Sequence, residues 1–67
     1  MSVARTTELS AVSEKSFEDA IAQAIARATK TLRNVKGAWI KDQLVEVEGE
    51  RIVRYKVHLM VTFVLDE

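Results

Sequence analysis

The C-terminal segment from Ile52 to Leu65 has an apolar residue at every second position. The alternating residues are Val53, Tyr55, Val57, Leu59, Val61, Phe63 and Leu65. Period-two apolarity of this length predicts a single β-strand, roughly 45 Å long at ~3.3 Å per residue. One helix can shield only part of such a strand. We therefore expect other copies of the chain to cover the rest, because proteins avoid large exposed apolar surfaces.

The short length and the composition also favour an oligomer. At 67 residues the chain forms one domain, residues 1–67. A domain of this size buries only about 60% of its unfolded surface. The chain has no cysteine, so disulfides and zinc sites built on cysteines are excluded. Association of copies is the remaining common way to stabilise so small a domain.

The charges are balanced, with ten Lys and Arg against ten Asp and Glu and no long run of one sign. This pattern argues against a dedicated nucleic-acid binder. No apolar run is long enough for a membrane span or a signal peptide. We therefore expect a cytoplasmic protein without a nucleic-acid or membrane partner.

The first half of the chain predicts a strand and then a helix. Residues 2–10 alternate weakly and are polar on both faces, as in an edge strand, and a polar link is expected from Ser10 to Lys15. Ser16 and Asp19 form a capping box, which starts a helix over residues 17–34 that ends near Gly37. Its apolar stripe consists of Phe17, Ile21, Ala24, Ile25, Ala28 and Leu32.

The second half predicts a hairpin. A strand over residues 38–47 is followed by a tight turn at Glu48-Gly49-Glu50, with Gly49 available for a positive φ, and then by the long strand. The resulting order β-α-β-β predicts an α+β fold with a three-stranded antiparallel sheet on one helix.

Pairing the last two strands around this turn predicts which side chains share a face of the sheet. It sets Trp39 opposite Met60, Lys41 opposite His58, and Gln43 opposite Lys56. The apolar residues of the long strand then face the helix. The opposite face collects aromatic, basic and amide groups: Trp39, Lys41, Gln43, Lys56, His58 and Met60.

The chain resembles a known family, the dodecins, over nearly its whole length. The similarity lies in the β-α-β-β order, in the helix segment AIARATKTLRNV at residues 24–35, and in the closing segments YKV at 55–57 and VTFVLDE at 61–67. The resemblance implies a hollow shell of twelve identical subunits. It also implies a ligand held between subunits, which is a flavin in many members and coenzyme A or calcium in some. The implied role is storage and sequestration of a cofactor.

Carried over residue by residue, the flavin site of the family matches only in part. Gly37 stands where the family has its flavin-stacking tryptophan, and Lys56 where it has a glutamine at the flavin edge. The arginines that meet a flavin phosphate in bacterial members fall at Leu44 and Val64. An acidic residue near the ribityl chain is kept as Asp42, followed by Gln43. Residues 38–41, with Lys56 after the tyrosine, resemble a divergent branch that includes calcium-binding members.

Trp39 lies two residues beyond Gly37 and therefore on the same strand face, where it is a candidate to stack on a ligand. The cofactor-binding candidates are Trp39, Asp42, Gln43, Lys56 and His58. Each has a structural alternative. Trp39 can be an interface aromatic, Lys56 can pair with a carboxylate of another copy, and His58 can be a solvated strand residue.

These observations give a main hypothesis and two alternatives. The main hypothesis is a homododecameric shell that stores or sequesters a flavin such as FMN, FAD or riboflavin. The first alternative is a divergent shell that binds no flavin and takes calcium, through Glu46, Glu48 and Glu50, or another ion, or no ligand. The second is an adaptor that joins a hetero-complex through a strand edge. We do not expect an enzyme, because the sequence has no cysteine nucleophile, no recognisable Ser-His-acid set and no glycine-rich phosphate loop.

Overall fold

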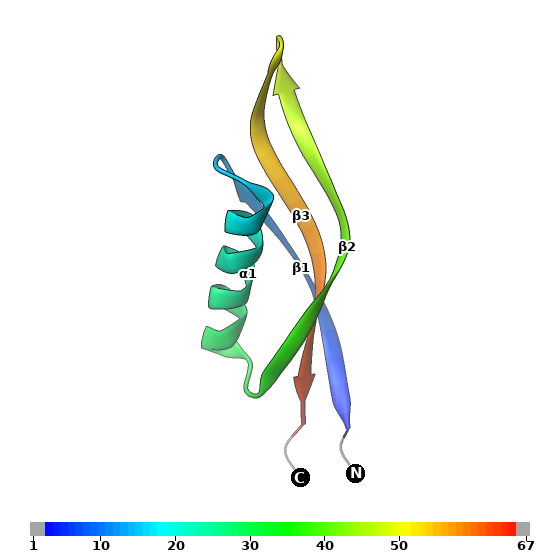
Figure 1. The fold of residues 1–67 in the computed structure, drawn as a ribbon. Coiled ribbons are helices and arrows are strands. Elements are labelled where there is room, and N and C mark those ends of the chain that lie inside the picture. The colour runs from blue at the N-terminus through cyan, green and yellow to red at the C-terminus, as the bar shows by residue number, and fades with distance from the viewer. Residues whose placement is uncertain (1–2, 66–67) are drawn as a thin grey trace.

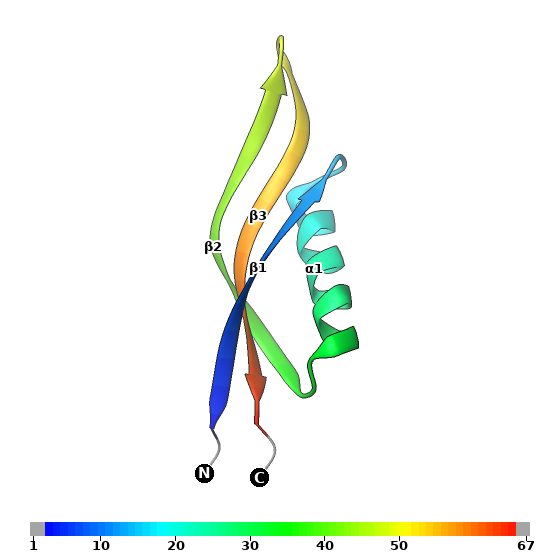
Figure 2. The same ribbon diagram turned by 180° about the vertical axis from the view of Figure 1, so that it is seen from behind.

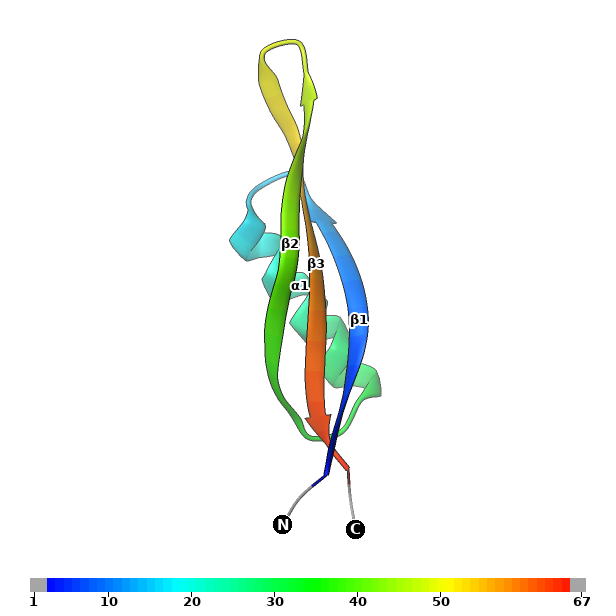
Figure 3. The ribbon, with the colours of Figure 1, turned by 90° about the vertical axis from the view of Figure 1, so that its right-hand side faces the viewer.

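The computed structural model describes residues 3–65. Its elements are β1 (Ala4–Ser13), α1 (Phe17–Thr31), β2 (Val35–Glu48) and β3 (Arg51–Val64). The strands form one sheet in the order β1-β3-β2, with both neighbours antiparallel to β3. The helix lies along one face of this sheet (Figures 1 and 3). The predicted α+β fold, with three antiparallel strands and one helix, is confirmed.

The core lies between the helix and the central strand. Val57, Leu59 and Val61 of β3 are fully buried against three buried alanines of the helix, which are Ala20, Ala24 and Ala28. Alanines spaced by four residues share one helical face, and their small side chains let the backbone approach the sheet closely. The larger stripe residues Ile21 and Ile25 are only partly buried. The predicted stripe thus missed its most buried member, Ala20, because alanine carries little apolar signal.

The predicted capping box has two hydrogen bonds, and the start of the helix shows one of them. The Asp19 N–H donates to Ser16 Oγ at 2.9 Å. The Asp19 carboxylate does not accept from the Ser16 N–H. Its Oδ2 accepts instead from Ser13 Oγ and from Gln23 Nε2, both at 2.6 Å. The hydrogen bond from Ser13, then that from Gln23, lowers the pKa of Asp19, and the charge of Lys15 adds to the effect.

The end of the helix was predicted three residues too late. The helix ends at Thr31, Leu32 is already extended, and Asn34 takes a left-handed φ of 61°. Asparagine tolerates this conformation because its short polar side chain bonds locally. Here Asn34 Nδ2 also donates to the Val64 carbonyl at 3.3 Å. Asn34, and not Gly37, therefore redirects the chain into β2.

The first strand is longer than predicted. It continues through Ser13, which lies opposite Tyr55, so residues 10–13 belong to the sheet and not to a polar link. The long β3 offers a pairing partner at each of these positions, and satisfying backbone hydrogen bonds outweighs the weak strand propensity of the segment. Ser2, at the start of the predicted strand, lies outside the described residues, as do Asp66 and Glu67 of the quoted C-terminal segment.

The hairpin of β2 and β3 extends beyond the rest of the molecule (Figure 1). β1 ends opposite Tyr55, and the ring of Phe17 at the helix start meets the ring of Tyr55 edge-on at 5.1 Å. Beyond this contact the two strands continue alone to the turn, where Gly49 adopts the expected positive φ of 64°. Val47 and Ile52 are 57% and 48% exposed there. The expectation that one helix shields only part of the long strand is confirmed.

The molecule is accordingly elongated, with extents of 52 × 19 × 13 Å. Both ends of the described chain lie at the end opposite the hairpin turn (Figure 2). Within residues 3–65 there is no helix with the length and apolarity needed to cross a membrane.

Candidate ligand-binding face

The sheet face turned away from α1 carries the candidate site. Because Val57, Leu59 and Val61 face the helix, the residues between them on β3 point to the opposite side. We call this side the open face. Its residues near the middle of the sheet are Glu8, Ser10, Trp39, Lys41, Asp42, Lys56, His58 and Met60.

Two irregularities in the pairing of β2 with β3 determine which residues share the open face. Counted from the turn, Val47 pairs with Ile52 but Glu46 pairs with Arg54, so Val53 is an extra residue of β3. Further along, Asp42 pairs with His58 but Ile40 pairs with Leu59, so Lys41 is an extra residue of β2. The predicted pairings of Lys41 with His58 and of Gln43 with Lys56 are therefore wrong. Each extra residue shifts the register by one, so Val53 displaces the pairing from Glu46 to Asp42, and Lys41 restores the predicted pairing at Trp39.

The same shift moves Gln43 to the other side of the sheet. It lies opposite Val57, whose side chain faces the helix. Cross-strand pairs share a face, so Gln43 leaves the open face. Trp39, Asp42, Lys56 and His58 remain together on it, and the predicted pairing of Trp39 with Met60 is confirmed.

The centre of the open face is a close Asp–His pair. His58 Nδ1 lies 2.7 Å from Asp42 Oδ1, and the two side chains are 31% and 59% exposed. A carboxylate can only accept, so Nδ1–H donates to it, and in the neutral imidazole Nε2 is then left as an acceptor. The pair gives the open face a histidine ring of defined tautomer.

Trp39 stands beside this pair and is 65% exposed. It lies opposite Met60, and Met60 lies opposite Glu8 on β1. Lys41 Nζ approaches Glu8 Oε2 at 3.4 Å across this row. The indole therefore has an exposed aromatic surface, with Met60 and the Lys41–Glu8 ion pair as its neighbours on the sheet.

Lys56 occupies the open face toward the hairpin. It is partly buried and lies opposite Leu44 on β2 and Val12 on β1, which are 42% and 44% exposed. Within residues 3–65 its ammonium group has no hydrogen bond or ion pair. Its neighbours Arg54 and Glu46, by contrast, pair at 2.9 Å, and that bond raises the pKa of Arg54. Lys56 is thus a cation available to an outside anion.

Gly37 leaves room on the same face. It lies opposite Thr62, two residues from Trp39 with no bulge between them. A Cβ added at Gly37 meets no atom within 4 Å, and the backbone needs no glycine conformation there. A Cβ at Gly37 would therefore point into open space on this face.

Ser10, His58 and Asp42 form a row across the three strands, an arrangement that the sequence did not reveal. Within the described part of the chain the Ser10 hydroxyl makes no hydrogen bond, so the contact between nucleophile and base that a catalytic triad needs is not formed. Residues 3–65 contain no group of three or more His, Cys, Asp or Glu side chains arranged to hold a metal ion.

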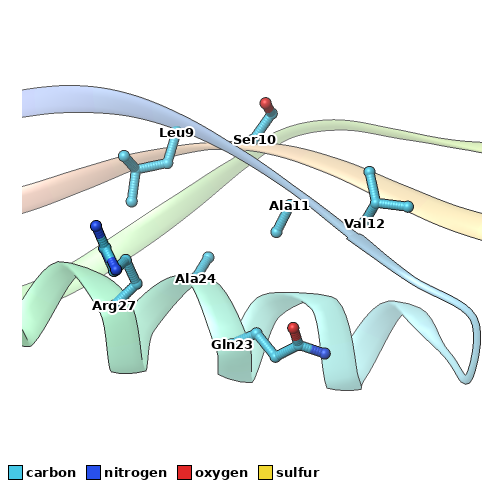
Figure 4. A pocket seen from close by; sticks show the side chains of 7 residues that line it. All are labelled: Leu9, Ser10, Ala11, Val12, Gln23, Ala24 and Arg27. Carbon is cyan, nitrogen blue, oxygen red and sulfur yellow. The ribbon is translucent and has the colours of Figure 1, made fainter.

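Two grooves lie away from the open face. One, of about 220 Å³, runs between β1 and α1, with Leu9 and Ala11 turned toward Ala24 and with Arg27 and Gln23 at its rim (Figure 4). The other, of about 260 Å³, lies where the end of the helix meets the end of β3. Neither contains a predicted site residue.

One sequence signal could have revealed the bulge. The observed register sets Asp42 opposite His58 and Glu46 opposite Arg54, whereas the predicted one set two basic residues face to face. Opposite charges stabilise cross-strand pairs and like charges do not. Testing alternative registers for charge complementarity would have favoured the observed pairing.

Comparisons with known proteins place this geometry in one family. The family model described as Dodecin matches residues 3–66. An arginine-to-alanine mutant of the Thermus thermophilus dodecin is 36% identical, with a TM-score of 0.92 and full coverage of both chains. Dodecins of Streptomyces coelicolor and Streptomyces davaonensis are 26% and 27% identical. Both have TM-scores of 0.90 over 98% of this chain, covering 94% and 97% of theirs.

Among the curated proteins none matches the sequence. The family match nevertheless spans almost all of the chain, and the solved structures share its order of elements and its sheet. This chain therefore belongs to the dodecin family.

Proposed function

We propose that the chain assembles into a hollow homododecamer that binds and sequesters a flavin between its subunits. The isoalloxazine ring would stack on Trp39. The observation that carries the proposal is the 65% exposed indole on the open face, beside the Asp42–His58 pair, in a member of the dodecin family. The proposed activity is binding and storage in the cytoplasm, without catalysis.

The unsupported hairpin favours assembly. A two-stranded hairpin is at best marginally stable in water, yet β2 and β3 continue past both β1 and the helix. Its apolar side chains, including Val45, Val47 and Ile52, remain exposed in the single chain. Contacts with other copies would bury them and offset the small core of six buried apolar residues.

The chemistry of the open face favours a planar, partly polar ligand. Trp39 supplies a stacking surface and Met60 an adaptable sulfur contact. The Asp42–His58 pair supplies hydrogen-bonding groups beside them. A flavin held there would be shielded from water on both ring faces once a second subunit closes over it. Electron transfer from the adjacent indole would quench its excited state.

Lys56 favours a ligand with a phosphate. It lies directly opposite Leu44, where the resemblance puts an arginine of bacterial members. Opposed cross-strand residues have Cβ atoms about 5 Å apart, so a positive charge is retained close to that position. We therefore expect FMN to bind more tightly than riboflavin. Lys56→Gln should reduce this preference.

The test is a flavin titration followed by fluorescence. Trp39 is the only tryptophan, so its emission reports on the open face directly. We expect flavin and tryptophan emission to fall together as the complex forms. Trp39→Ala should abolish binding and Trp39→Phe should weaken it, since phenylalanine keeps an aromatic face. Lys30→Ala, on the exposed side of the helix, is the matched control. Unchanged emission at high protein concentration would refute flavin binding.

A second candidate is a dodecin shell that binds no flavin. The observation in its favour is the open space at Gly37, where the resemblance puts the stacking tryptophan, together with Lys56 in place of the edge glutamine. Calcium would then need carboxylates from several copies, since the described part of one chain groups no three such ligands. Calorimetry with calcium and with FMN on the assembled protein distinguishes the two candidates.

A further inference from the structure

The Asp42–His58 pair lies where it can form a specific hydrogen bond with the proposed ligand. We infer that His58 hydrogen-bonds to the pyrimidine edge of the flavin, with Nε2 accepting a hydrogen bond from the ring N3–H. This inference rests on the proposed flavin binding. Asp42 is the positioning residue, because it fixes the tautomer in which Nε2 is the acceptor. This role replaces that of an edge glutamine, whose place is taken here by Lys56.

The tautomer follows from the contact between the two side chains. At 2.7 Å the carboxylate oxygen of Asp42 must accept from His58 Nδ1–H. The only other polar atom of the neutral ring is Nε2, which then carries a lone pair and no proton. The described residues provide no hydrogen-bond partner for Nε2, so it is available to a ligand.

The position of His58 suits a ligand stacked on Trp39. Trp39 lies opposite Met60, and His58 is two residues from Met60 on the same face of β3, about 7 Å along the strand. Such diagonal neighbours in a sheet lie within reach of each other's side chains. A three-ring flavin that stacks on the indole turns one edge toward the sheet and spans this separation.

The other polar groups near Trp39 are less available. The ammonium of Lys41 is engaged with Glu8 at 3.4 Å and lacks an acceptor. Gln43, the amide that the sequence placed on this face, lies on the opposite side of the sheet. His58, at 31% exposure, is also the more enclosed member of its pair. Among these groups His58 combines a free acceptor with partial burial, which makes a lost hydrogen bond costly.

The test compares riboflavin with 3-methylriboflavin, in which the N3 proton is replaced by a methyl group. Titrations of the assembled protein by flavin fluorescence are run at pH 8. We expect the wild type to bind riboflavin roughly tenfold more tightly, as one net hydrogen bond implies. His58→Ala should bind both flavins within about twofold of each other. His58→Gln, whose amide oxygen can accept, should restore the preference.

The outcomes separate this inference from the proposed function. If the wild type binds both flavins with equal affinity, flavin binding stands and the role of His58 is refuted. If His58→Ala keeps the wild-type preference while Asp42→Ala loses it, the carboxylate reads the edge directly and the inference is again overturned. If the wild type binds neither flavin, the proposed function fails and the inference fails with it. Lys30→Ala, remote from the open face, should retain the wild-type preference.

Discussion

Replacing Leu59 by alanine should strongly destabilise the fold, because Leu59 is fully buried at the centre of the core. The change removes three carbon groups. At ~0.8 kcal/mol for each, the lost transfer free energy is about 2.4 kcal/mol. The surrounding alanines of the helix are too small to fill the space, so a cavity term adds to this. We expect a total of about 3–4 kcal/mol, within the roughly 2–5 kcal/mol typical of buried leucines.

The matched control is Leu44→Ala, because the same side chain is removed from a residue that is 42% exposed in the single chain. Urea unfolding, followed by circular dichroism, is measured for both variants and the wild type at equal chain concentrations. Assembly raises apparent stability with concentration, so each series is repeated at two concentrations. The loss for Leu59→Ala should be the same at both, whereas any loss for Leu44→Ala should depend on concentration. Equal losses at both concentrations for the two variants would refute the assigned core.

Three further predictions concern the helix cap, acid stability and the open face. Ser16→Ala removes the acceptor for the Asp19 N–H and should cost about 1 kcal/mol of unfolding free energy, while Ser10→Ala should cost almost nothing; equal effects in urea unfolding would contradict the cap. The lowered pKa of Asp19 stabilises the fold above the ordinary carboxyl range near pH 4, and this contribution is lost as the pH falls through the folded-state pKa. The stability difference between wild type and Asp19→Asn should therefore shrink from pH 6 to pH 2, and a constant difference would contradict the assignment. Gly37→Trp should fold normally and tighten flavin binding by fluorescence titration, since the position is open and lies on the face of Trp39; loss of assembly would contradict this.

Much of the fold was predictable because its signals are local. The alternation in β3, the Ser16 cap and the turn at Gly49 each arise from residues near one another in sequence, and each was confirmed. The family resemblance was likewise visible along the whole chain and is confirmed by the family match.

The misplaced boundaries have a common physical cause. The helix ends early because Asn34, and not the expected glycine, takes the left-handed conformation and bonds to the end of β3. The first strand is longer because β3 offers it partners as far as Tyr55. Both effects depend on a distant strand, so patterns within the segments themselves could not fix them.

The candidate site was predictable only in part for a similar reason. Two inserted residues, Val53 of β3 and Lys41 of β2, enclose a stretch that is one position out of the predicted register. Asp42 and not Lys41 therefore meets His58, and Gln43 leaves the open face. A bulge is not marked by a characteristic residue type, so the sequence does not show where it lies. A register shift of one residue nevertheless moves each side chain to the opposite face of the sheet. The ligand roles of Trp39, Asp42, Lys56 and His58 stay predictions.

Native mass spectrometry of freshly purified protein, without added cofactor, tests the central claim most directly. We expect a particle of twelve subunits that carries additional mass matching bound flavin. A particle of twelve subunits with no bound mass, and with no uptake of added FMN, would contradict flavin storage while keeping the shell. A monomer or dimer would contradict the shell itself, because a closed shell needs many copies of the chain.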